Sequence, residues 1–187
     1  MKRLLHILPR IPPAICGTGD QTTYLADALL QEHGIESHFL PAGHELGAPH
    51  ELRPKLQAQF EAIDAVTIQY SCYGFQKRGI PFHLVNAIKH LRQSHPKLPV
   101  LTMFHELAAS GPITSSAFWL GRIQRSLVGR LARLSTAVRT NRVAYKKELE
   151  SLAPAHAGKI VSMPIFSNFG ETAHPLPIEQ RNPSLVL

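Results

Sequence analysis

At residues 65–70 the chain reads Ala-Val-Thr-Ile-Gln-Tyr, a short stretch rich in β-branched and apolar residues. This composition predicts a strand, because branched side chains pack well on a pleated surface. Its apolar content favours a strand that is covered by helices on both faces, as in a parallel sheet. We therefore take this stretch as a buried strand of a parallel sheet.

Strands and helices alternate on both sides of this stretch. Short apolar segments predict further strands at 3–8, 37–40, 100–104, 136–138 and 159–163. Helical periodicity predicts helices at 22–33, 55–61, 81–94, 116–134 and 140–152. This alternation predicts the α/β class, with a Rossmann-like three-layer α/β/α arrangement around a mainly parallel sheet.

Four loops are candidates for ligand binding: residues 9–20, 70–79, 105–115 and 163–171. Right-handed crossovers place the strand-to-helix loops of such a fold at one edge of the sheet. Ligands of open α/β sheets bind outside that edge, at the carboxyl ends of the strands.

The composition narrows the class of protein. Of the 187 residues, 20 are Lys or Arg and 13 are Asp or Glu, and the formal net charge is +7. This excess favours an anionic partner, which is a nucleic acid, an anionic lipid or a phosphorylated substrate. No nucleic-acid motif accompanies the charge, so we expect no nucleic-acid partner. The apolar amino terminus is too short for a signal peptide, and we expect a cytoplasmic location.

A glycine-containing segment, Gly17-Thr18-Gly19-Asp20, directly precedes the first predicted helix. Glycines here let backbone N–H groups approach an oxyanion at a helix start, which makes the segment a candidate for binding an anionic group of a ligand. The other interpretation is a tight turn with Asp20 as the helix N-cap. A dinucleotide fingerprint would need glycine in place of Thr22, and a P-loop is absent, so no cofactor is expected.

His105 and Glu106 follow the predicted strand 100–104 at the ligand edge and form a candidate catalytic pair. Glu106 could fix the tautomer of His105 or cap the next turn, and His105 could instead be hydrogen-bonded scaffolding. The chain has 11 histidines, but none are three or four positions apart. No metal site is predicted, because no helix would present a chelating pair.

The loop 70–79 holds Tyr70, Tyr73, Lys77 and Arg78. Aromatic rings suit stacking on sugars, and the two cations suit contact with a phosphate, so these residues are candidates for binding a sugar or a phosphate group. The alternative is a packed turn with a solvated basic tip.

In the helix 116–134, four arginines, at 122, 125, 130 and 133, share one side, which is either solvated or rests on an anionic membrane.

The order and spacing of these segments resemble the amino-terminal domain of group 1 glycosyltransferases, the large retaining family with the GT-B fold. The segments that carry this resemblance are 3–8 with 17–20, 69–75, 103–107 and 166–171, and it covers essentially the whole chain. Residues 1–174 would form this domain, and residues 175–187 a linker with the start of a truncated second domain.

The resemblance implies one half of a GT-B enzyme, in which the amino-terminal domain binds the acceptor and a second domain binds most of the nucleotide-sugar. It places Gly17 and Gly19 near the donor diphosphate, His105 near the donor sugar, and the residues of loop 70–79 near a glycan, lipid-linked or phosphorylated acceptor. The donor motif of the family, a pair of glutamates, is absent from this chain. We therefore expect the chain alone to be inactive. The alternative is a non-catalytic module that binds a glycan or nucleotide, or a degenerate fragment of an enzyme.

Overall fold

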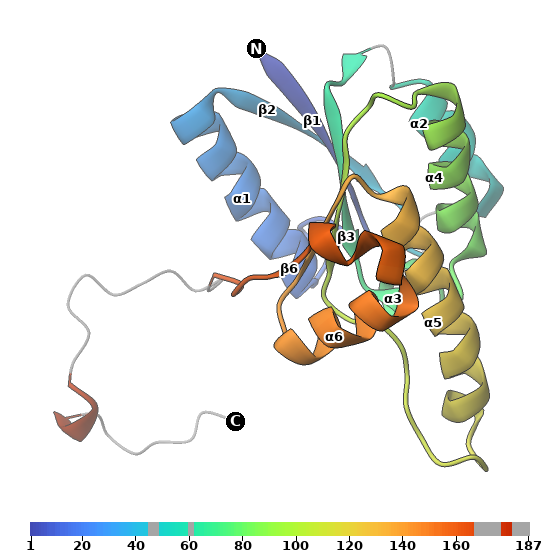
Figure 1. Ribbon diagram of the computed structural model, residues 1–187. Coiled ribbons are helices and arrows are strands. Elements are labelled where there is room, and N and C mark those ends of the chain that lie inside the picture. Colours follow the sequence, from blue (N-terminus) through green and yellow to red (C-terminus); the bar gives the residue numbers. More distant parts are fainter. Residues whose placement is uncertain (45–48, 60–61, 167–176, 181–187) are drawn as a thin grey trace.

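A computed structural model of the protein describes residues 1–44, 49–59, 62–166 and 177–180 (Figure 1). All six strands are parallel and form one sheet in the order β2-β1-β3-β4-β5-β6. The strands are β1 (Lys2–Leu8), β2 (Ile35–Pro41), β3 (Ala65–Tyr70), β4 (Val100–Phe104), β5 (Ala137–Thr140) and β6 (Ile160–Ser162). The α/β, Rossmann-like fold class predicted from the sequence is confirmed.

Helices connect the successive strands. The α-helices are α1 (Gly17–His33), α2 (Leu52–Gln57), α3 (Cys72–Phe75), α4 (Phe82–Ser94), α5 (Ser116–Leu134) and α6 (Val143–Leu152). Short 3₁₀ helices cover η1 (Pro49–Glu51), η3 (Pro154–Lys159) and η4 (Ile178–Gln180). None of the helices in the described ranges is long and apolar enough to cross a bilayer.

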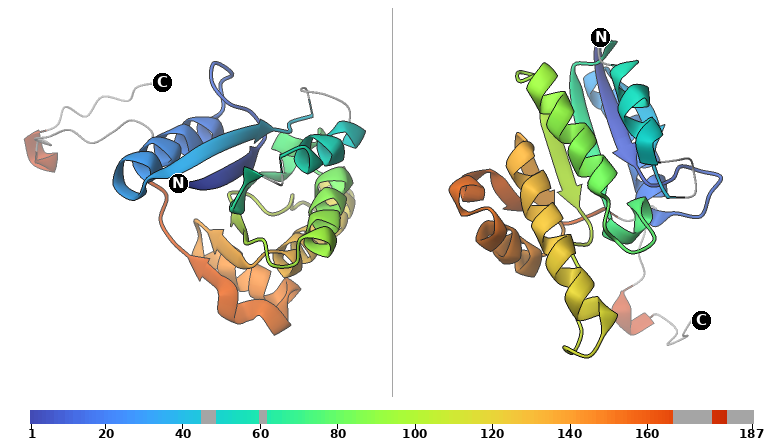
Figure 2. Two further views of the ribbon diagram at one scale, coloured as in Figure 1. Left: turned by 90° about the horizontal axis from the view of Figure 1, so that it is seen from above. Right: turned by 90° about the vertical axis from the view of Figure 1, so that its right-hand side faces the viewer.

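The main core lies on one face of the sheet. Because side chains alternate along a strand and parallel partners share a face, Val66, Ile68 and Tyr70 of β3 point to the same side. All three are buried in one apolar cluster with residues of α2, α4, α5 and α6. Figures 1 and 2 show these helices together on that side of the sheet, and α1 on the other.

The second face is more polar and less covered than expected. Its β3 positions are Thr67 and Gln69, and its β4 positions, Leu101 and Met103, stay partly exposed. α1 lies against β1 and β2. The expectation that helices cover both faces of the strand 65–70 is therefore only partly correct, because α1 packs at the β1–β2 end.

Several boundaries differ from those predicted. A short helix, α3, lies inside the expected loop 70–79, and α2 ends at Gln57, well before the predicted end at 61. Residues 60–61 lie outside the described part of the chain, as do 167–176 and 181–187. The domain boundary predicted at 174 and most of the linker predicted over 175–187 therefore also lie outside the described residues.

Candidate functional site

The strand order reverses direction between β1 and β3. From β1 the chain moves to β2 at one side, and it then returns to place β3 at the other side of β1. In open α/β sheets, ligands bind outside the carboxyl ends of strands at such a reversal. The loops after β1, β3 and β4 meet this edge, and they carry most of the site residues predicted from the sequence.

His105 lies directly after β4 and is held by two contacts with β3. Its backbone N–H donates to the carbonyl oxygen of Tyr70 at 2.9 Å. Its ring Nε2 lies 2.8 Å from Oε1 of Gln69. An amide oxygen only accepts, so the ring carries its hydrogen on Nε2, and Nδ1 keeps a lone pair that can accept a hydrogen bond.

Burial keeps the imidazole of His105 neutral at pH 7. Desolvation lowers its pKa below the usual value, and the neighbouring Glu106 carboxylate acts in the opposite direction as the smaller effect. The group at this edge is therefore an oriented, neutral hydrogen-bond acceptor.

Glu106 is bound to the loop after β3. The hydroxyl of Ser71 donates to Oε2 of Glu106 at 2.7 Å, which joins the ends of β3 and β4. Ser71 is the N-cap residue of α3 but makes no side-chain capping bond, because its hydroxyl is directed to the carboxylate. Glu106 is exposed and can accept further hydrogen bonds. Together His105, Glu106, Gln69 and Ser71 form one cluster, which we call the His105 cluster.

Neither Gln69 nor Ser71 was among the site residues predicted from the sequence. The available signal was Gln69 itself, a polar residue in an otherwise apolar strand end. It is buried, with 6% of its surface exposed. A buried amide needs a hydrogen-bond partner, and the ring of His105 provides one.

The expected glycine loop is the first turn of α1. The helix begins at Gly17, its N-cap is Cys16, and the backbone N–H of Asp20 donates to the Cys16 carbonyl at 2.9 Å. The prediction of Asp20 as N-cap is thus wrong, and so is the expected helix start at 22. A side chain at position 19 would place Cβ within 2.4 Å of the Arg10 carbonyl oxygen, so Gly19 lets α1 pack closely on the preceding loop.

Tyr70 is not available to an acceptor. Its side chain is fully buried, and its ring lies 5.1 Å from that of Phe104 and 6.2 Å from that of Phe75. Burial raises the pKa of its phenol far above the usual value. The prediction of direct acceptor contact by Tyr70 is therefore wrong, because α3 covers the end of this central strand.

The other three candidates of the loop 70–79 are on the surface. Tyr73, Lys77 and Arg78 are exposed, and they remain candidates for binding an acceptor. The loop is fixed by Gln124 of α5, which is fully buried and donates from Nε2 to the Arg78 carbonyl at 2.9 Å. The Oε1 atom of Gln124 accepts from the backbone N–H of Ala109 at 2.7 Å, so one side chain holds two loops of the site edge.

The arginine side of α5 is only partly available to a ligand. Arg125 forms an ion pair with Glu148 of α6 at 2.7 Å. Arg133 donates to the carbonyl oxygen of Leu152 at 2.9 Å. The expectation of four arginines directed to solvent or a membrane is therefore corrected for these two, because α6 packs beside α5.

No protein-family model matches this sequence, and no curated protein is significantly similar to it. Among solved structures, pyridoxal kinase from Entamoeba histolytica is 12% identical, with a TM-score of 0.49, over 87% of this chain and 64% of the kinase. This chain therefore spans less than two thirds of that protein.

Two sugar-binding proteins are also among the similar structures. A carbohydrate transporter from Acidothermus cellulolyticus 11B, in complex with myo-inositol, is 10% identical, with a TM-score of 0.40, over 86% of this chain and 73% of the transporter. An ABC-transporter solute-binding protein from Actinobacillus succinogenes 130z, with bound D-allose, is 6% identical, with a TM-score of 0.36, over 87% and 77%. At identities of 6–12% these structures share no more than the fold with this chain.

Proposed function

We propose that this chain is the acceptor-side domain of a glycosyltransferase that transfers a sugar from a nucleotide-sugar. The observation that carries the proposal is the neutral His105 ring, oriented by Gln69 at the carboxyl edge of the sheet. A sugar hydroxyl both donates and accepts hydrogen bonds. The lone pair on Nδ1 and the exposed Glu106 carboxylate accept from such hydroxyls side by side.

In this function His105 and Glu106 position the donor sugar. An imidazole held by Gln69 fixes the sugar against the acceptor without a rearrangement during transfer, and such positioning can supply a large part of a rate enhancement. Tyr73 is 43% exposed and offers a ring for stacking on an acceptor sugar. Lys77 and Arg78 beside it offer cations for an acceptor phosphate.

The test is sugar binding by the 187-residue chain, measured by saturation-transfer NMR with UDP-glucose, GDP-mannose and UDP. We expect saturation of the sugar-ring protons of at least one nucleotide-sugar, lost in His105→Ala and kept in His33→Ala. His33 is an exposed histidine at the far end of α1 and serves as the matched control. If no nucleotide-sugar binds, or if His105→Ala binds as the parent does, the proposal is wrong.

Transfer itself requires a donor-binding half. We therefore expect no turnover of these nucleotide-sugars by the isolated chain, even where binding is measured. Robust turnover by the isolated chain would show that it carries a complete catalytic site and would reject the half-enzyme assignment.

A second candidate function is a non-catalytic module that binds an uncharged glycan. The observation that favours it is the position of Asp20 in the first turn of α1. A carboxylate there already complements the positive end of the helix dipole and repels a donor diphosphate. If this function is correct, free oligosaccharides bind at least as tightly as nucleotide-sugars in the same NMR experiment.

Peripheral membrane contact stays a proposal for the amino-terminal part of α5. This end of α5 and the loop before it project from the body of the domain (Figures 1 and 2). Ile113, Trp119 and Ile123 are 64%, 58% and 41% exposed there. Arg122 is exposed on the same turns, and an apolar surface with a cation is typical of interfacial helices.

A further inference from the structure

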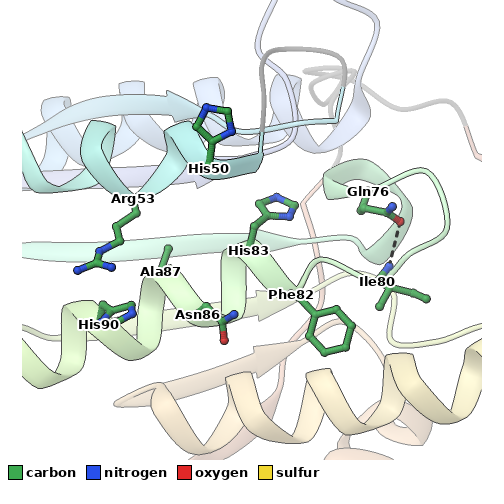
Figure 3. A pocket seen from close by; sticks show the side chains of 9 residues that line it. All are labelled: His50, Arg53, Gln76, Ile80, Phe82, His83, Asn86, Ala87 and His90. Carbon is green, nitrogen blue, oxygen red and sulfur yellow. Dashed lines mark hydrogen bonds between the residues drawn. The ribbon is translucent and has the colours of Figure 1, made fainter.

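A groove of about 650 Å³ lies between α4 and the segment formed by η1 and α2, away from the His105 cluster. Figure 3 shows the side chains that line it. The residues that matter for its chemistry are His50, Arg53, Phe82, His83, Asn86 and His90. A volume of about 300–1,000 Å³ is typical of sites for small molecules.

The spacing on α4 explains why polar groups gather in this groove. His83, Asn86 and His90 follow each other at intervals of three and four, so they share one side of the helix, which faces α2. Ala87 lies between them and is small and buried, which keeps the floor of the groove open. Arg53, on the α2 wall, reaches toward His90 of α4 (Figure 3). His83 of α4 points toward His50 of η1.

The lining favours a negative ligand. No Asp or Glu of the described residues lines the groove, whereas Arg53 carries a permanent charge. Arg53, His83 and His90 have no side-chain hydrogen bond or ion pair within the described ranges. The nearby Glu51 is paired with Lys55 at 2.8 Å. Nor do any three His, Cys, Asp or Glu side chains in the described part of the chain come together to hold a metal ion.

We propose that this groove binds a small organic phosphate, with the phosphate between Arg53 and His90. A phosphate accepts several hydrogen bonds at once, and arginine can bind it through two parallel N–H groups. The groove is far larger than a phosphate ion, and its other end, at Ile80 and the 49% exposed Phe82, is mainly apolar (Figure 3). Gln76 also lies there, and its Oε1 accepts from the backbone N–H of Ile80 at 3.3 Å. The organic part of the ligand lies there, with Asn86 able to bind its hydroxyls.

This inference goes beyond the proposed function and does not depend on it. The groove shares no residue with the His105 cluster or with the first turn of α1. A domain that fails to bind nucleotide-sugars can still bind a phosphate ester at Arg53.

The test is isothermal titration calorimetry of the 187-residue chain with glucose 6-phosphate, glucose, glucuronate and inorganic phosphate. We expect glucose 6-phosphate to bind at least about 10-fold more tightly than glucose, since a charge-assisted bidentate contact is worth about that factor. Glucuronate should bind with an affinity between the two, because its carboxylate can also pair with Arg53 but has fewer acceptor oxygens and less negative charge than a phosphate. Inorganic phosphate should bind more weakly than glucose 6-phosphate because it leaves the apolar end unfilled.

Variants then assign the site to the groove. Arg53→Gln should weaken the binding of glucose 6-phosphate about 10-fold or more, and Arg53→Lys should restore only part of it, because lysine has no bidentate fork. His90→Gln should weaken binding several-fold. Lys147→Gln removes the same charge from an exposed position on α6 and should leave the affinity within about twofold, because only distant screening changes. Arg53 is exposed, so its variants should melt with the parent.

Three outcomes would overturn the proposal. The first is no heat of binding with glucose 6-phosphate at millimolar concentration. The second is equal affinity for glucose and glucose 6-phosphate. The third is an equal loss of affinity in Arg53→Gln and Lys147→Gln, which would indicate a response to net charge alone. Equal affinity for inorganic phosphate would reject the assignment of the organic part to the Phe82 end.

Discussion

His6 and Thr67 face each other across β1 and β3, with Nδ1 of the imidazole 2.8 Å from the threonine Oγ1 although 61 positions separate them. The second ring nitrogen lies 3.0 Å from the hydroxyl of Ser37 on β2. The ring also stacks on Phe39 with centroids 5.4 Å apart. One buried neutral imidazole thus connects three strands on the polar face of the sheet.

This burial makes folding sensitive to acid. Desolvation lowers the pKa of His6 from 6.5 to about 4 in the folded protein. Below pH 6.5 the His6 ring binds a proton in the unfolded chain but stays neutral in the folded protein. The free energy of unfolding therefore decreases as the pH falls toward 4. At pH 5 this site should cost about 2 kcal/mol relative to pH 7. His6→Gln keeps polar groups but cannot titrate, and its stability should fall less over this interval.

Urea unfolding at pH 7 and pH 5 measures this difference. His83 and His105 also have lowered pKa values and act in the same direction, but they are present in both proteins and cancel in the comparison. Equal losses of unfolding free energy in the parent and in His6→Gln would contradict the prediction.

Gln69→Glu should raise the pKa of His105. A carboxylate 2.8 Å from Nε2 stabilises the imidazolium, and an adjacent opposite charge shifts a pKa by about one unit or more. An NMR titration of the His105 ring proton measures the shift. In the uncharged control Gln69→Leu no charge is added, and the pKa of His105 should stay low. An unchanged pKa in Gln69→Glu would show that the two side chains are not in contact.

Gln124→Leu should destabilise the domain by about 2–4 kcal/mol. A fully buried backbone group left without a partner costs about 1–3 kcal/mol, and the two groups that lose Gln124 are part-buried, which favours the lower part of that range for each. The groups concerned are the Arg78 carbonyl and the Ala109 N–H. Urea unfolding gives the loss, and hydrogen exchange should show faster exchange of the Ala109 amide. Gln93→Leu, at an exposed position of α4, is the control. Equal effects of the two substitutions would refute the role of Gln124.

Gly19→Ala should destabilise the protein although alanine favours helices. Its Cβ would lie 2.4 Å from the Arg10 carbonyl, so the helix or the loop must shift, at a cost of about 1–3 kcal/mol. Gly158→Ala is the matched control, because no atom lies within 4 Å of its added Cβ. Melting curves of both variants decide the matter, and a parent-like Gly19→Ala would show that α1 does not pack this closely.

Trp119 is the sole tryptophan and reports on membrane contact at the start of α5. We expect vesicles that contain phosphatidylserine to shift its emission to the blue, and pure phosphatidylcholine vesicles to leave it unchanged. Salt should reverse the shift, because it screens the attraction of Arg122 to anionic lipid. Arg122→Gln should weaken the effect. An identical response to both kinds of vesicle would exclude the electrostatic mechanism.

The sequence by itself determined the alternation of strands and helices and therefore the parallel sheet. Stretches such as 65–70 and 100–104 are predicted as strands from their local composition, because branched and aromatic side chains fit a pleated, buried surface. The position of His105 at the ligand edge also followed from this pattern, since right-handed crossovers place every strand end on the same side.

The partners of each side chain were decided only by the tertiary structure. The bond between His105 and Gln69 joins residues 36 positions apart, and the register of β3 against β4 sets it. The burial of Tyr70 depends on α3, which no periodicity indicates because it is only four residues long. The groove at Arg53 exists because α2 packs beside α4, and the pattern of one helix does not specify which surface of another helix it will meet.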